Sequence, residues 1–209
     1  MNHPATDTQR ALDAWLDGVP VAPSPDPAGL LPGAIDGATA ELVFGLLVWE
    51  AGVPAAVSAA RRLAEQFVDA NEMRVALVEE IEDTIGLTDT HAMERAGLIL
   101  STLLHAFDTL DAVSIDAVAR AGAHEARPYL ESIPGLPRFV IDRVMLLALG
   151  EARIPVDERL RGVLADKGVI AREMPTGDAA DLLTRVCPAE QARGLYLRLE
   201  AAAGRLVRA

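Results

Sequence analysis

Hydrophobic residues recur every three or four positions along most of the chain, which is the period of an amphipathic α-helix. Residues 8–17 place Leu12 and Leu16 on one face of such a helix. Residues 38–51 are apolar nearly all round, as expected of a buried helix. The pattern predicts about ten helices and no strand, so the expected fold class is all-α. No period of about 20–50 residues repeats, which argues against a solenoid.

Polar capping residues and glycines predict where the helices begin and end. Residues 18–37 contain five prolines and four glycines, which indicates a loop between helices. Gly86 and Gly150 are each expected to end a helix. Three further helices are expected to follow a polar cap: residues 72–85 after Asn71, residues 91–107 after Asp89 or Thr90, and residues 115–122 after Ser114.

Composition narrows the class of protein. The 209 residues are 51% hydrophobic but only 4% aromatic, which favours helices. Charged residues interrupt every apolar run before it reaches the roughly 20 residues of a membrane span, so no membrane association is expected. The N-terminus lacks the order of a signal peptide, which predicts a cytoplasmic location. The single cysteine, Cys187, excludes an intramolecular disulfide and any multi-cysteine metal site.

The net charge of −12 argues against a nonspecific nucleic-acid binder, because phosphate contacts need lysine and arginine. This charge is unevenly spread along the chain. Residues 37–128 have 6 arginines and 15 acidic residues, whereas residues 129–209 have 12 basic and 11 acidic residues. The acidic run at residues 79–83 is expected to be a solvated helix face rather than a cation site. No metal and no cofactor are therefore expected.

The stretch from residue 129 to residue 160 has the clearest local signals in the chain. A short helix is followed by a Pro-Gly turn at residues 133–137 and then by an apolar helix over residues 138–149. Gly150 ends this helix, and Asp157 lies where the next helix should begin. The stretch predicts two helices joined by a tight hairpin, and then a loop that places an aspartate at a helix start.

This stretch resembles the helix-hairpin-helix DNA glycosylases, and among them the endonuclease III branch. The family hairpin reads Leu-Pro-Gly-Val-Gly-Arg-Lys, and this chain reads Ile133-Pro134-Gly135-Leu136-Pro137-Arg138-Phe139. The separation of Phe139 from Asp157 matches the family's spacing between its two catalytic residues. The segments Thr84-Ile85-Gly86-Leu87 and Val186-Cys187-Pro188-Ala189-Glu190 also resemble family segments. The likeness covers roughly residues 41–205.

The resemblance implies a two-lobed architecture. A six-helix barrel lobe would span residues 36–151 and end with the hairpin. A second helical lobe would combine residues 1–35 with residues 152–209. The substrate pocket would lie in the cleft between the lobes, with Asp157 facing residue 139.

The catalytic positions depart from the family pattern in one respect. Phe139 stands where bifunctional members have the lysine that forms a Schiff base, and a phenyl ring cannot be a nucleophile. The only lysine of the chain, Lys167, lies at the far end of the helix that Asp157 starts. Lyase chemistry through lysine is therefore not expected. Asp157 is either the carboxylate used by monofunctional members or an ordinary helix cap, and these two roles are compatible.

The DNA-binding positions also depart from the family. The family hairpin holds a DNA phosphate with backbone N–H groups, and Pro137 removes one such donor. Leu136 and Arg138 keep their N–H groups, and the Arg138 side chain can contact phosphate directly. Glu50 aligns with the glutamine that fills the gap left by a flipped base, where a carboxylate would repel phosphate. A solvated or salt-bridged side chain is the expected fate of Glu50.

Two functions remain open from the sequence. The first is a DNA-repair protein acting as a monofunctional DNA N-glycosylase, with Asp157 as catalytic residue, residues 134–138 on DNA, and Phe139 and Glu50 lining the pocket. The second is a catalytically degenerate relative that binds DNA or, through its acidic barrel lobe, a protein partner. Neither would hold the family's iron–sulfur cluster, because the four cysteines of that cluster are missing.

Overall fold

The computed structural model describes residues 4–21, 23–33, 35 and 37–206. Within these residues the chain forms twelve α-helices, one 3₁₀-helix and no strand beyond an isolated bridge between Gly33 and Asp69. The all-α prediction is confirmed. The elements are α1 (Pro4–Leu16), α2 (Gly37–Val48), α3 (Val53–Gln66), α4 (Ala70–Val75), α5 (Val78–Ile85), α6 (Ala92–Leu110), α7 (Asp116–Ala121), α8 (Ala123–Ser132), α9 (Arg138–Leu147), α10 (Glu158–Asp166), α11 (Thr176–Val186), η1 (Ala189–Gln191) and α12 (Ala192–Leu206).

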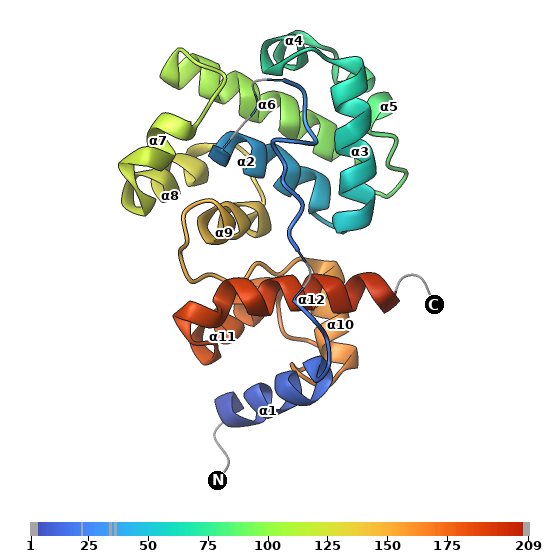
Figure 1. Cartoon of the computed structure of the whole chain (residues 1–209), viewed down its shortest axis with the longest axis vertical. Helices are drawn as coiled ribbons and strands as arrows, with labels where there is room; N and C mark the ends of the chain where they lie inside the picture. Colours follow the sequence, from blue (N-terminus) through green and yellow to red (C-terminus); the bar gives the residue numbers. More distant parts are fainter. Residues whose placement is uncertain (1–3, 22, 34, 36, 207–209) are drawn as a thin grey trace.

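The helices form two groups along the long axis of the molecule (Figure 1). Helices α2 to α9 lie in the upper part of the view, and α1, α10, α11 and α12 lie in the lower part. Helix α2 packs against α3, α6, α7 and α9, and α9 also packs against α12 of the other group. Helix α3 packs against α12 as well, so α3 and α9 lie where the two groups meet. No helix in the described part of the chain is long and apolar enough to cross a membrane.

Helix α2 is the most deeply buried element, as its apolar sequence predicts. Every residue from Ala38 to Val48 is buried, including the charged Glu41. Helix α9 is buried over Phe139–Leu146, and this run includes the charged Asp142 and Arg143. Because two central helices bury charged residues, the polar contacts of these residues matter for the junction between the groups.

The helix predicted over residues 72–85 is two helices in the structure, which accounts for part of the excess over the ten expected. Asn71 is not the cap of α4. The cap is Asp69, which accepts a 3.0 Å hydrogen bond from the Glu72 N–H, while Glu72 accepts one of 2.6 Å from the Val68 N–H. These two hydrogen bonds, which resemble a capping box but reach the residue before the cap, fix the earlier start. At Ala76 the backbone becomes extended and ends α4.

Two other predicted helix starts are displaced by one residue. The N-cap of α6 is His91, and Asp89 accepts a 2.9 Å hydrogen bond from the His91 N–H instead of capping the helix itself. The N-cap of α7 is Ile115, and the Ser114 hydroxyl accepts from the Asp116 N–H at 3.2 Å. The polar residues therefore still satisfy N–H groups at these starts, but from outside the cap position.

Candidate functional site

A cavity of about 260 Å³ lies where the end of α2, the start of α9 and the start of α10 meet. It brings together five residues that the sequence analysis singled out: Glu50, Pro137, Arg138, Phe139 and Asp157. The other residues that line it are Trp49, His91, Val156, Glu158, Thr176 and Gly177. Pro134, Gly135 and Leu136 of the hairpin turn are described by the structure but do not line this cavity.

Asp157 is the N-cap of α10, and its side chain is 0% exposed. Its Oδ1 accepts a 2.8 Å hydrogen bond from the Leu160 N–H, and its Oδ2 accepts one of 3.1 Å from the Glu50 N–H. The Arg159 guanidinium lies 3.5 Å from Oδ2. The capping role of Asp157 is therefore present, and both carboxylate oxygens are held in place.

Glu50 follows α2 in a left-handed backbone conformation with φ of 59°, which is uncommon outside glycine. Its carboxylate accepts hydrogen bonds from the N–H groups of Glu158 at 2.8 Å and Arg159 at 3.3 Å. The expectation of a solvated or salt-bridged Glu50 is wrong, because the orphan N–H groups at the start of α10 bind it instead. Burial, followed by repulsion from Asp157, raises the pKa of Glu50.

Phe139 is the second residue of α9, where the buried run of that helix begins, and it is 3% exposed. Lys167 is exposed at the C-cap of α10, at the other end of that helix from Asp157. Among the described residues that line the cavity there is neither a lysine nor a cysteine. The cavity therefore offers a carboxylate but no side-chain amine for covalent chemistry with a sugar.

The hairpin turn contains Gly135 with φ of 75°, and Pro137 is the N-cap of α9 rather than its first residue. The Leu136 N–H, which the sequence left available for phosphate, donates to the Ile133 carbonyl at 3.3 Å. The N–H groups of Arg138 and Phe139 begin α9 and so have no acceptor within the helix. These two donors are the part of the hairpin that remains suited to an anion.

The Arg138 side chain is 47% exposed and binds two carboxylates. Its Nε lies 3.1 Å from Asp142 Oδ2, and its Nη2 donates to Asp181 on α11. The hydrogen bond with Asp181 is the main cause that raises the pKa of Arg138. The Asp142 pair follows the i,i+4 spacing on one helix, whereas Asp181 comes from a distant part of the sequence. The positive charge of Arg138 is therefore already balanced by these two carboxylates.

Arg95, which no sequence pattern singled out, holds the end of α2 beside the cavity. Arg95 is 0% exposed, and its guanidinium donates to the carbonyls of Leu46 at 3.0 Å and Trp49 at 2.7 Å. It also pairs with Asp89 at 3.1 Å. Carbonyls at a helix end have no helical partner, so Arg95 satisfies the groups that α2 leaves open. The residue preceding Glu50 is thereby fixed.

A second missed feature is a buried polar network behind Asp157. Arg159 binds Glu200 with contacts of 2.8 and 3.0 Å, and the Tyr196 hydroxyl donates to Glu200 at 3.1 Å. Arg143 donates to the Tyr196 hydroxyl at 2.7 Å and lies 2.8 Å from Glu41. Burial raises the pKa of Glu200. These residues lie on α2, α9, α10 and α12, so sequence spacing gave no signal of their contacts.

No family model and no curated protein sequence matches the chain. Solved structures do. A trapped endonuclease III–DNA covalent intermediate is 18% identical over 95% of this chain and 85% of its own, with a TM-score of 0.68. The MagIII 3-methyladenine DNA glycosylase of H. pylori, bound to 1,N6-ethenoadenine, is 12% identical over 99% of this chain and 98% of its own, with a TM-score of 0.59.

An 8-oxoguanine glycosylase/lyase of Clostridium acetobutylicum, in complex with double-stranded DNA, is also similar. It is 13% identical over 99% of this chain and 70% of its own, with a TM-score of 0.63. Each of the three structures aligns with at least 95% of this chain, but at most 18% of the residues are identical. The similarity therefore lies in the arrangement of the helices.

Proposed function

Because the chain has the fold of the helix-hairpin-helix DNA glycosylases, we propose that it is a DNA-repair protein that hydrolyses a base N-glycosyl bond without a lyase step. The observation that supports this best is the cavity in which Asp157 and Phe139 lie together beside the hairpin. The proposal assigns the barrel lobe to residues 36–151 and the second lobe to residues 1–35 and 152–209.

Asp157 is the catalytic residue of this proposal. When a base leaves, positive charge develops on the sugar, and a fixed carboxylate stabilises that charge. The N–H groups of Leu160 and Glu50 hold the two oxygens of Asp157, so little reorganisation is needed as the charge forms. Phe139 supplies an apolar wall and no amine, so water rather than the protein would attack the sugar.

DNA would lie across the start of α9. The N–H groups of Arg138 and Phe139, at the start of α9, would bind one phosphate oxygen, and the half-exposed Arg138 side chain would bind another. Pro134, Gly135 and Leu136 would position the backbone, with Pro137 closing the turn. In this arrangement Glu50 would line the pocket without entering the DNA stack, because its carboxylate is bound to α10.

The second candidate is a relative that has lost catalysis and binds DNA or a protein. One observation favours it. Asp157 accepts a hydrogen bond from the Glu50 N–H, Glu50 accepts one from the N–H of the neighbouring Glu158, and the Asp157 side chain has no exposed surface. A protein partner would contact the acidic barrel lobe, where 15 acidic residues outnumber 6 arginines over residues 37–128. Such a partner would be basic.

The test combines DNA binding with base release. The protein is titrated against duplexes containing uracil, alkylated, deaminated or oxidised bases, and affinity should fall steeply between about 50 and 200 mM salt if phosphates are bound. Base release should occur with the wild type and disappear with Asp157→Asn. Binding without release from any duplex would support the second candidate, and absence of binding at low salt would reject the glycosylase. Borohydride with abasic DNA should trap no adduct.

A further inference from the structure

Three glutamates in the described part of the chain have a pKa raised by burial, namely Glu41, Glu50 and Glu200. Two of them are paired with arginines: Glu41 lies 2.8 Å from Arg143, and Glu200 binds Arg159 at 2.8 and 3.0 Å. Glu50 differs from both. Within the described residues no arginine or lysine forms an ion pair with it, and its carboxylate is bound by two backbone N–H groups.

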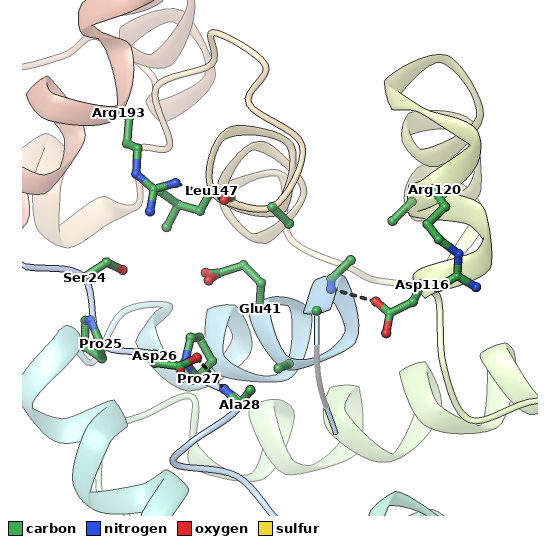
Figure 2. A pocket seen from close by; sticks show the side chains of 15 residues that line it. Ser24, Pro25, Asp26, Pro27, Ala28, Glu41, Asp116, Arg120, Leu147 and Arg193 are labelled. Atoms are coloured by element: carbon green, nitrogen blue, oxygen red, sulfur yellow. Dashed lines mark hydrogen bonds between the residues drawn. The ribbon is translucent and has the colours of Figure 1, made fainter. Parts of the chain in front are cut away.

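The surroundings of Glu41 and Glu50, at the two ends of α2, are also different. Glu41 lines a separate cavity of about 680 Å³, whose walls include the start of α2 and the end of α9 (Figure 2). The other carboxylate drawn beside it, that of Asp116, accepts a 2.7 Å hydrogen bond from the Ala38 N–H. Glu50 lines the cavity of Asp157 instead. The glutamate without a cationic partner therefore lies in the proposed glycosylase site.

Glu50 is adjacent to Asp157 and more accessible than Asp157. The Asp157 side chain is 0% exposed, and its two oxygens accept hydrogen bonds from the N–H groups of Leu160 and Glu50. A carboxylate held in this way can stabilise positive charge on a sugar, but it presents no surface to a water molecule. Glu50 is partly exposed, and each of its oxygens has a second lone pair beside the one that accepts a backbone N–H.

The backbone of Glu50 is in the left-handed conformation, with φ of 59°, that glycine adopts without a steric penalty. A side chain at such a position costs conformational free energy, and residues of this kind cluster at active sites. Here the conformation directs the Glu50 carboxylate to the start of α10 and to the cavity.

We propose that Glu50 is the general base of the glycosylase site, an assignment that rests on the proposed function. The oxygen of a water molecule forms a bond to sugar C1′ while the bond from C1′ to the base nitrogen breaks, and the electron pair of that bond leaves with the base. Glu50 takes the proton that the water loses and later releases it to solvent, while the departing base takes up one proton from solvent. Asp157 stabilises the positive charge on the sugar. The two carboxylates have different roles because their surroundings differ.

Two other side chains of the cavity are able to accept a proton, and both have partners of their own. His91 Nδ1 lies 2.9 Å from Glu94, and the Glu158 carboxylate pairs with Arg161 while 60% of its side chain is exposed. They serve as comparisons for Glu50. The charged and titratable groups that contact Glu50 or line its cavity are His91 before α6, Arg138 of α9, Asp157 before α10, and Glu158 and Arg159 of α10.

The rate of base release tests the assignment. Single-turnover release is measured between about pH 5 and 8 on the duplex from which the wild type releases a base. The wild-type rate should rise with pH as Glu50 loses its proton, because a general base must be ionised. Glu50→Gln should lower the rate by about 10²–10⁴-fold and remove this rise, without weakening DNA binding. His91→Gln and Glu158→Gln should keep the rise, as should the exposed control Glu79→Gln on α5.

Chemical rescue distinguishes a base from a structural group. Glu50→Gly removes the carboxylate and suits the left-handed backbone. Formate should raise the rate of this variant at least about tenfold and leave the wild-type rate unchanged, because formate supplies the missing proton acceptor. Sodium chloride at the same concentration is the control, and urea unfolding shows whether each variant is folded.

The outcomes separate this assignment from the proposed function. Wild-type release that survives Glu50→Gln, a pH rise that disappears only with His91→Gln or Glu158→Gln, or a loss in Glu50→Gly that formate does not reverse would each overturn the role of Glu50 alone. Absence of base release by the wild type would reject the proposed function, and the assignment of Glu50 with it.

Discussion

Asp157 binds the backbone at the end of α2, and Glu50 binds the backbone at the start of α10. The Asp157 carboxylate accepts a hydrogen bond from the Glu50 N–H at 3.1 Å, and the Glu50 carboxylate accepts one from Glu158, the residue after Asp157, at 2.8 Å. The contact joins the end of α2 to the start of α10, and so joins the two helix groups. Two carboxylates stand close together here because the positive end of the α10 dipole and its N–H groups stabilise both.

The reciprocal contact predicts coupled stability effects. Asp157→Ala should lower the free energy of unfolding by about 2–4 kcal/mol, because it removes a cap and leaves the Glu50 N–H without an acceptor. Glu50→Ala should cost about 1–2 kcal/mol. The double variant should cost less than the sum, by about 0.5 kcal/mol or more, since the two changes remove one shared contact. Urea unfolding measures all three free energies.

Asp166→Ala is the matched control for this cycle. Asp166 lies on the same helix and pairs with Arg172 at 2.8 Å, but both side chains are more than half exposed. Its loss should cost at most about 1 kcal/mol. If Asp157→Ala cost no more than the control, the contact with Glu50 would contribute nothing to stability.

The stability of the protein should fall as the pH rises above 4.5 through the raised pKa values of three glutamates. Burial raises the pKa of Glu41, Glu50 and Glu200 above the ordinary value of 4.5, so the folded state binds protons more tightly than the unfolded state. The stabilisation that comes from this tighter proton binding is complete below pH 4.5. It is lost as the pH rises through the folded-state pKa of each glutamate. The hydrogen bond from Arg138 lowers the pKa of Asp181, which acts in the opposite direction but only at more acidic pH.

Glu50→Gln should make this pH dependence shallower, because the amide oxygen still accepts from α10 but no longer titrates. The exposed Glu79→Gln on α5 is the control and should leave the dependence as in the wild type. The free energy of unfolding is measured in urea at pH 5, 6, 7 and 8. A stability that rises with pH in the wild type would contradict this account.

The hairpin and the Asp157 cap could be predicted because their signals are local. A Pro-Gly turn, a glycine stop and an aspartate before a helix each act within a few residues, and all three occur in the structure. The start of α4 was predicted wrongly for a reason that is also local. Asp69 and Asn71 are both good caps, and the hydrogen bond that the Val68 N–H donates to the Glu72 carboxylate favours the first.

The role of Glu50 could not be predicted, because its partners lie more than 100 residues away in sequence. The buried Arg95 and Arg143 pose the same difficulty. A charged residue on an apolar helix can be solvated or paired, and the sequence does not show which distant carbonyl or carboxylate will satisfy it. In this chain the contacts depend on how helices from different parts of the sequence pack.

Asp181→Asn should strengthen DNA binding if Arg138 contacts phosphate. Asp181 currently binds the Arg138 guanidinium, and its loss would leave Arg138 with Asp142 alone. The slope of log affinity against log salt should become steeper, by up to about 1, and Arg138→Ala should make it shallower by about 1. The control is Asp178→Asn, an exposed acid on the same helix. Equal salt slopes for all three variants would exclude Arg138 from the interface.

Arg95→Met should be among the most destabilising single changes in the chain. The variant keeps most of the side-chain volume but removes the donors to Leu46 and Trp49 and leaves Asp89 without its counter-charge, which together cost about 3–5 kcal/mol. Arg95→Lys should recover only part of this loss, because an ammonium group cannot bind two carbonyls and a carboxylate with the fork geometry of a guanidinium. Urea unfolding gives the free energies, with the exposed Arg61→Met on α3 as control, expected within about 0.5 kcal/mol of the wild type. A cost for Arg95→Met below about 1 kcal/mol would show that the end of α2, and with it Glu50, is held in place by other contacts.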